Sequence, residues 1–131
     1  HIINIFLPKV CHLKCMWYNC YNNCILDYFR NGIIDYCEQQ NIAFLAYSPV
    51  GGGNGKVRTE NSHPLNKVAQ AFDATPYQIA LAWLLEKSPV MIPIPGASRV
   101  ENAISSADAM SIKLSDDDML YLNQAFGVVK T

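Results

Sequence analysis

Apolar positions recur along the chain from residue 32 onward with the spacing of alternating helices and strands. Ile33, Ile34 and Cys37 fall on one side of a short predicted helix. Residues 42–47 are then apolar at nearly every position. A run of this kind is typical of a strand that is covered on both faces in a parallel sheet. The pattern therefore predicts a short helix followed by a buried parallel strand.

Two longer helices are predicted next. An apolar stripe indicates a helix that begins near Pro64. Its members, spaced at i, i+3, i+4 and i+7, are Leu65, Val68, Ala69 and Phe72. A second helix begins at Thr75, a favourable N-cap, with Pro76 in the first helical position, and it ends before Pro89. Its predicted inward positions are Ile79, Ala80 and Trp83.

A second strand and two more helices complete the pattern. The β-prone run 90–92 predicts a strand that the prolines at 93 and 95 should stop. Residues 99–109 then read as a helix, and Ser115, followed by three aspartates, opens the last one, with Met119, Leu122 and Phe126 as its apolar stripe. Strands that alternate with helices predict an α/β fold with parallel strands.

Composition narrows the class of protein without identifying it. The 131 residues are 50% hydrophobic and 16% charged, which is typical of one globular domain. Ten basic and eleven acidic residues give a net charge of −1, so no footprint for nucleic acid is expected. With no apolar run near ~20 residues and no signal-peptide pattern, we expect a cytoplasmic protein without a membrane partner.

All five cysteines lie in the first 37 residues. A zinc site is one interpretation, and its ligands would come from Cys11, His12, Cys15, Cys20 and Cys24. Their spacing lacks the paired C-x2-C arrangement of common zinc sites. Free thiols that behave as small hydrophobic side chains in a reducing compartment are the favoured interpretation.

A glycine cluster follows the first strand, with four glycines within residues 51–55. A Walker A loop fails because Val50 and Val57 occupy its first and last positions, and a G-x-G-x-x-G fingerprint fails at Lys56. Glycines still let backbone N–H groups approach an anion, with the Ser48 hydroxyl nearby. A phosphate-binding loop and a solvated loop are both compatible with these residues.

The second strand ends in a similar way. Gly96, Ala97, Ser98 and Arg99 provide small residues, a hydroxyl and a guanidinium before a predicted helix N-terminus. Helix N-termini bind anions, and Arg suits phosphate. In (β/α)8 barrels the phosphate site is typically built by the loops after the seventh and eighth strands. Two successive loops of this kind therefore match the C-terminal end of such a barrel.

Three separated segments carry a resemblance to a known family. They are FLAYSPVGGG, TPYQIALAWLLEKSPVMIPIPGASR and IKLSDDDMLYLNQAF, in this order along the chain. Over about residues 32–126 the chain resembles the C-terminal part of the aldo/keto reductase family. The resemblance implies an incomplete (β/α)8 TIM barrel with parallel strands, and NADPH-dependent reduction of aldehydes or ketones. Residues 32–131 would form this oxidoreductase part, and residues 1–31 match it poorly.

The resemblance also assigns roles to residues. Tyr47 would stack on the nicotinamide ring of NADP(H), where ordinary core packing is the structural alternative. Ser48, Pro49, Val50 and Gly51 would lie along the pyrophosphate. Gly96, Ala97, Ser98 and Arg99 would hold the 2′-phosphate, with an exposed helix-start side chain as the alternative for Arg99. Ser105 and Ser106 stand where the family has an acidic residue and an asparagine that bind adenine.

The family's catalytic Asp, Tyr, Lys and His belong to the N-terminal half of the barrel, so no catalytic residue is expected here. The predicted function is the cofactor-binding part of a truncated reductase that is inactive by itself. It would act on a small carbonyl substrate once the other half completes it. The alternative is a non-catalytic product that serves at most as a binding or interaction module. Open barrel edges predict marginal stability and self-association.

Overall fold

The computed structural model describes residues 10–11, 24–47, 49 and 64–128 of the chain. The strands and helices are β1 (Val10–Cys11), α1 (Cys24–Arg30), α2 (Ile33–Gln39), β2 (Ala43–Tyr47), α3 (Pro64–Ala71), α4 (Pro76–Lys87), β3 (Met91–Ile94), α5 (Val100–Asp108), the 3-10 turn η2 (Ala109–Ser111) and α6 (Asp116–Ala125). From residue 32 onward, this order of helices and strands is the one that the hydrophobic pattern predicts.

The three strands form one parallel sheet in the order β1, β2, β3. Val10 pairs with Ala43 between β1 and β2, and Phe44 pairs with Met91 between β2 and β3. Parallel neighbours need long crossover connections, which α1 and α2 supply before β2, and α3 and α4 supply before β3. The predicted α/β fold with parallel strands is confirmed.

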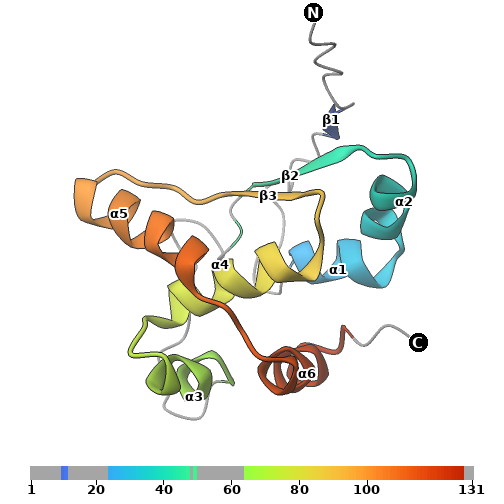
Figure 1. Cartoon of the computed structure of the whole chain (residues 1–131). Helices are drawn as coiled ribbons and strands as arrows, with labels where there is room; N and C mark the ends of the chain where they lie inside the picture. Colours follow the sequence, from blue (N-terminus) through green and yellow to red (C-terminus); the bar gives the residue numbers. More distant parts are fainter. Residues whose placement is uncertain (1–9, 12–23, 48, 50–63, 129–131) are drawn as a thin grey trace, which may run out of the picture.

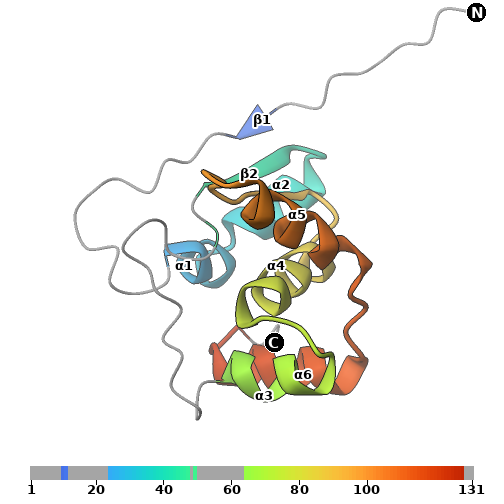
Figure 2. The ribbon, with the colours of Figure 1, turned by 90° about the vertical axis from the view of Figure 1, so that its left-hand side faces the viewer.

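The elements are arranged in three layers, with α4 in the middle (Figure 1). The sheet lies on one side of α4, and α3 and α6 lie side by side on the other (Figure 2). This position explains why α4 is apolar nearly all the way around. Its buried residues are Ile79, Leu81, Ala82, Trp83 and Leu84. Three of these buried residues were not among the predicted inward positions: Leu81, Ala82 and Leu84.

The two faces of the sheet differ in burial. Phe44, Ala46 and Met91 are at most 4% exposed and pack into the hydrophobic core. Side chains alternate along a strand, so Tyr47 and Ile92 belong to the opposite face, where they are 58% and 48% exposed. The sequence predicted that β2 is covered on both faces. Within the described residues this prediction is wrong, because the described helices pack on only one face of the sheet (Figure 1).

The second strand differs from its prediction, since β3 runs through Pro93 to Ile94 instead of stopping at residue 92. The amide of Phe44 donates to the carbonyl of Val90 at 2.8 Å. Hydrogen-bonded residues alternate along a parallel strand, so Ile92 and Ile94 also face β2, and Pro93 faces away. A proline on the outer side of an edge strand removes no bond of the ladder.

Two helices begin with reciprocal caps. The Thr75 hydroxyl accepts from the Gln78 amide at 3.2 Å, and the Gln78 side chain accepts from the Thr75 amide at 2.9 Å. Ser115 and Asp118 make the same pair of contacts at the start of α6, each at 3.1 Å. Such capping boxes satisfy donors that a helix start leaves unpaired. Both starts, predicted from the sequence, are confirmed.

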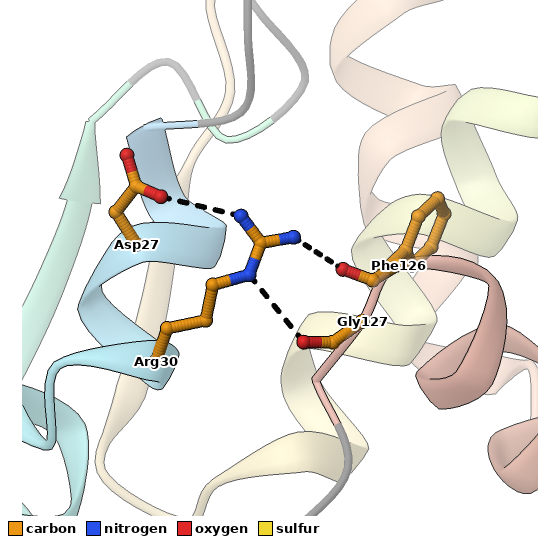
Figure 3. A network of polar contacts seen from close by, with 4 residues as sticks. All are labelled: Asp27, Arg30, Phe126 and Gly127. Carbon is orange, nitrogen blue, oxygen red and sulfur yellow. Dashed lines mark hydrogen bonds and ion pairs between the residues drawn. The ribbon is translucent and has the colours of Figure 1, made fainter.

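Two cations bind carbonyl oxygens at the C-terminal end of α6, and Figure 3 shows the contacts of one of them, Arg30. The guanidinium of Arg30 donates to the carbonyl oxygens of Phe126 at 2.6 Å and Gly127 at 3.4 Å. The Lys87 ammonium donates to the Val128 carbonyl at 3.0 Å. Phe126 is the C-cap residue of α6 and Gly127 and Val128 follow it, so these carbonyls have no partner within the helix and lie at its negative end. These contacts therefore attach α6 to α1 and α4.

Replacing Arg30 by alanine should lower the free energy of unfolding by about 1 kcal/mol, because the carbonyls at the end of α6 lose a charged donor. Asp27→Ala should cost clearly less. The Arg30–Asp27 ion pair, 3.3 Å long, joins side chains that are 48% and 64% exposed, so solvent screens it. Urea unfolding of both variants gives the comparison. Equal losses would assign the effect to the ion pair instead of the carbonyls.

Candidate functional site

The two predicted loops follow strands whose ends lie next to each other in the sheet. Tyr47, the last residue of β2, pairs with Ile94, the last residue of β3. Because the two strands are parallel, the polypeptide leaves the sheet at the same edge after each of them. Tyr47 and Ile94, after which the two candidate loops follow in the sequence, therefore lie side by side at this edge. In open and closed parallel α/β folds, this carboxyl edge is where ligands bind.

Tyr47 is exposed rather than packed into the core. Its residue surface is 58% exposed, and its face of the sheet is the one that the described helices leave open. Ile94, its neighbour on the same face, is 40% exposed. Core packing, the structural alternative for Tyr47, is thus wrong for the described residues. An exposed aromatic ring beside an exposed aliphatic side chain offers an apolar surface on which a planar group could lie.

Gly96, Ala97, Ser98 and Arg99 connect β3 to α5, and all four are exposed. At Gly96 a Cβ atom would meet no atom of the described residues within 4 Å, so these residues leave room for a ligand at the backbone there. Arg99 is the N-cap of α5 with extended backbone angles, and its side chain makes no capping bond. Among the described residues its guanidinium has no hydrogen-bonding or ionic partner.

Of residues 48–51, the predicted pyrophosphate loop, the structure describes only Pro49. Pro49 is buried, whereas Ser48, Val50 and Gly51 lie outside the described residues. The positions at which the family has its adenine-binding residues lie on α5. Ser105 and Ser106 occupy them here, and both are half-buried. The structure therefore brings Tyr47 and the 96–99 segment to one edge, and the roles of the pyrophosphate loop remain predictions.

Most residues of the alternative zinc interpretation lie outside the described part of the chain. His12, Cys15 and Cys20 are not described, while Cys11 belongs to β1 and Cys24 to α1. Within the described ranges, no three His, Cys, Asp or Glu side chains are grouped so that they could hold a metal ion. Cys37, in contrast, is buried in α2 and belongs to the hydrophobic core, as expected of a cysteine that behaves as a small hydrophobic side chain.

A shallow hollow elsewhere on the surface does not belong to this edge. It lies between α4 and η2, with Ala82 and Ala109 at its buried floor and Met110 exposed at its rim. The Lys113 ammonium bonds the Glu86 carboxylate across it at 3.2 Å. Glu86 precedes the start of β3, so the hollow is near the amino ends of the strands, opposite the carboxyl edge.

The parallel sheet, its crossover helices and the paired strand ends define a portion of a (β/α)8 barrel. The sequence model of the Aldo/keto reductase family matches residues 13–126, so the chain belongs to this family. Members of the family use NAD(P)H, and a complex with NADPH is among the solved structures that share the fold.

Individual relatives agree with this assignment. An uncharacterized oxidoreductase of Schizosaccharomyces pombe is 36% identical over 92 residues, which cover 70% of this chain and 29% of that protein. Pyridoxine 4-dehydrogenase of Escherichia coli K12 is 34% identical over 109 residues, which cover 83% of this chain and 36% of that enzyme. The chain therefore spans about a third of the length of these relatives.

A solved structure supports the fold independently. The crystal structure of a thermostable aldo-keto reductase in complex with the inhibitor epalrestat superimposes with a TM-score of 0.69 at 33% identity. The match covers 82% of this chain and 37% of that protein. In the described part of this chain, none of the helices has the length and apolar character needed to cross a membrane.

Proposed function

We propose that this chain is the cofactor-binding part of an NADPH-dependent oxidoreductase that reduces aldehydes or ketones. The carrying observation is the pairing of Tyr47 with Ile94, which starts both candidate loops at one edge of the sheet. The exposure of Tyr47 and the open backbone at Gly96 support a ligand at this edge. The family's use of NAD(P)H supports the class of ligand.

In this proposal Tyr47 stacks on the nicotinamide ring, and residues 48–51 follow the pyrophosphate. Gly96 gives the 2′-phosphate access to the backbone, Ser98 donates a hydrogen bond, and Arg99 supplies the charge. A guanidinium suits phosphate because its planar N–H groups can bind two oxygens at once. The exposed position of Arg99 before α5, with no competing partner among the described residues, supports this role.

In our proposal this chain lacks the catalytic groups that carbonyl reduction needs. Reduction of a carbonyl requires a positioned proton donor as the hydride arrives. Tyr47 is unsuited to this task if its ring lies against the nicotinamide, because its hydroxyl then points away from the reacting carbonyl. We therefore propose that the 131 residues bind NADP(H) but do not reduce a carbonyl by themselves, and that a small carbonyl substrate binds when the barrel is completed.

A titration of the purified chain with NADPH and with NADH tests the cofactor site, with nicotinamide fluorescence as the signal. Arg99→Ala should weaken NADPH binding by about 10- to 100-fold, because a charge-assisted hydrogen bond is worth about 1.5–3 kcal/mol. NADH, which lacks the 2′-phosphate, should bind the variant and the unchanged chain nearly equally.

Lys113→Ala is the matched control for this titration. It also removes one positive charge, but Lys113 bonds Glu86 near the opposite edge of the sheet. The NADPH affinity of Lys113→Ala should equal that of the unchanged chain. Equal weakening of NADPH and NADH by Arg99→Ala would contradict a 2′-phosphate contact. A folded chain that binds neither nucleotide would contradict the cofactor-binding proposal as a whole.

The second candidate function is a non-catalytic interaction module, in a cytoplasmic setting as for the first. One observation favours it: large apolar side chains are exposed on β3 and α5, with Ile92 at 48%, Val100 at 71% and Ile104 at 56%. Exposed apolar surface of this kind marks binding sites in soluble proteins. The nucleotide titration separates the two candidates, because an interaction module has no need of NADPH.

A further inference from the structure

The turn between α1 and α2 consists of an asparagine followed by a glycine. Asn31 and Gly32 follow Arg30, the last residue of α1, and precede Ile33, the first residue of α2. Asn31 is exposed, and Gly32 is half-buried. In such a pair the backbone nitrogen of the glycine can attack the side-chain amide carbon of the asparagine. The proposed cofactor site involves neither residue.

Two features of this turn favour the attack. The Asn31 side-chain oxygen accepts from the Ile33 amide at 3.1 Å. This bond draws electron density from the side-chain amide carbon, and the ring that it closes contains the Gly32 nitrogen, so both reacting atoms belong to one small ring. The Gly32 amide makes no hydrogen bond to any described residue. No hydrogen bond among these residues therefore has to break before the nitrogen reacts.

The backbone of Gly32 explains why a glycine stands at this position. Its φ angle is 80°, in the left-handed region that favours a residue without a Cβ atom. A Cβ atom there would meet no described residue within 4 Å, so the requirement comes from the backbone conformation and not from crowding. The missing side chain also leaves the Gly32 nitrogen accessible to the amide carbon of Asn31. The turn that joins the two helices thus creates the reactive pair.

We propose that Asn31 is a site of spontaneous deamidation in the folded chain. The Gly32 nitrogen loses its proton to water and bonds to the side-chain carbon of Asn31. The bond from that carbon to its amino group breaks, and the leaving group takes up a proton and departs as ammonia. Water then opens the cyclic imide at either carbonyl, which yields aspartate or isoaspartate with no oxidation or reduction. This inference does not depend on cofactor binding.

The two products differ in their effect on the turn. Aspartate keeps the backbone and a side-chain oxygen that can accept from the Ile33 amide. Isoaspartate places an extra carbon in the main chain between α1 and α2, so it changes how the two helices are joined. Arg30, the neighbour of Asn31, donates to the Phe126 carbonyl at 2.6 Å. Isoaspartate should therefore also disturb the contact between α1 and the end of α6.

The test incubates the full chain at neutral pH and physiological temperature and follows each asparagine by peptide mass spectrometry. Chymotrypsin cleaves after aromatic residues, so Asn31 and Asn41 fall on different peptides. Asn41 is the matched control: it is also exposed and lies in the turn after α2, but the amide of the following Ile42 donates to the Cys37 carbonyl at 2.8 Å. Conversion at Asn31 should be about tenfold faster or more, because a bonded amide and a branched side chain both raise the barrier to attack.

The same measurement in guanidinium chloride shows what the fold contributes. We expect conversion at Asn31 to be at least as fast in the folded chain as in the unfolded chain, and circular dichroism confirms the state of each sample. Asn54 and Gly55 form the same pair in the sequence, outside the described residues, and fall on a further peptide. Slower conversion of Asn31 in the folded chain, or a rate no higher than at Asn41, would overturn the proposal.

Asn31→Ser measures the effect on stability. Serine cannot form the imide, whereas its hydroxyl can still accept from the Ile33 amide. During incubation the urea midpoint of the unchanged chain should fall further than that of Asn31→Ser, because isoaspartate accumulates only in the former at this turn. Freshly prepared Asn31→Asp, which has the side chain of the aspartate product, should unfold at the same urea concentration as the fresh unchanged chain. An equal fall in the unchanged chain and in Asn31→Ser would contradict the effect assigned to isoaspartate.

Discussion

Trp83→Ala is expected to lower the free energy of unfolding by about 3–5 kcal/mol, which is among the largest losses that truncation of one side chain causes. Trp83 lies in α4 and is 2% exposed. Its ring makes edge contacts with Phe29 of α1 at 5.7 Å and with Phe126 at the end of α6 at 5.2 Å. Its removal leaves a cavity where three helices meet.

Trp83 also makes a specific hydrogen bond. Its indole N–H donates to the side-chain oxygen of Asn123 at 3.0 Å, and Lys87 donates to the same oxygen at 3.1 Å. A buried indole usually finds such a partner, because burying the N–H unpaired is costly. Trp83→Phe keeps most of the apolar volume and loses this bond, so it should cost much less than Trp83→Ala.

Urea unfolding followed by circular dichroism measures both Trp83 variants. The stability of a small domain is of the same order as the predicted loss, so we expect Trp83→Ala to be largely unfolded at 25 °C. Trp83→Phe should retain a transition at lower urea than the unchanged chain. Equal losses for the two variants would show that the hydrogen bond, and not the packing of the ring, dominates the contribution of Trp83.

The second large effect is expected at Phe44, in the central strand of the sheet. Phe44 is 1% exposed, and its ring makes an edge contact with Tyr28 of α1 at 5.4 Å. Phe44→Ala should cost about 3–5 kcal/mol, because it removes the contact between β2 and the helices that cover it. β2 links the two other strands, so the carboxyl edge of the sheet should lose its order as well.

Leu45→Ala is the matched control on the other face of β2. Leu45 is half-buried and belongs to the face that the described helices leave open, so its truncation should cost clearly less than that of Phe44. The same urea titration compares them. A loss at Leu45 as large as at Phe44 would mean that the open face is covered in solution.

The elements and their starts could be predicted from the sequence because their signals are local. The apolar stripe of α3 and the caps at Thr75 and Ser115 need residues within one or two turns of each other. The prediction for β3 was wrong by two residues because Pro93 is compatible with an edge strand and incompatible with a central one. The sequence does not show which of these a strand is.

The candidate site, too, could be predicted from the sequence only in part. Glycines, a hydroxyl and Arg99 after two strands indicated anion-binding loops, and the family resemblance gave them a cofactor. No sequence signal predicted that Tyr47 would pair with Ile94 and remain exposed beside it. Nor did any signal predict that Arg30 would donate to the carbonyl of Phe126, the C-cap residue of α6, which lies 96 residues away along the chain.

The sequence by itself determined the order of the helices and strands, their caps and the family, because periodicity, capping and motifs depend on neighbouring residues. The tertiary structure alone decided which strand ends meet and which face of the sheet the described helices leave open. These properties depend on the register between segments that are distant in sequence, and a shift of one residue would reverse the face to which every side chain of a strand points.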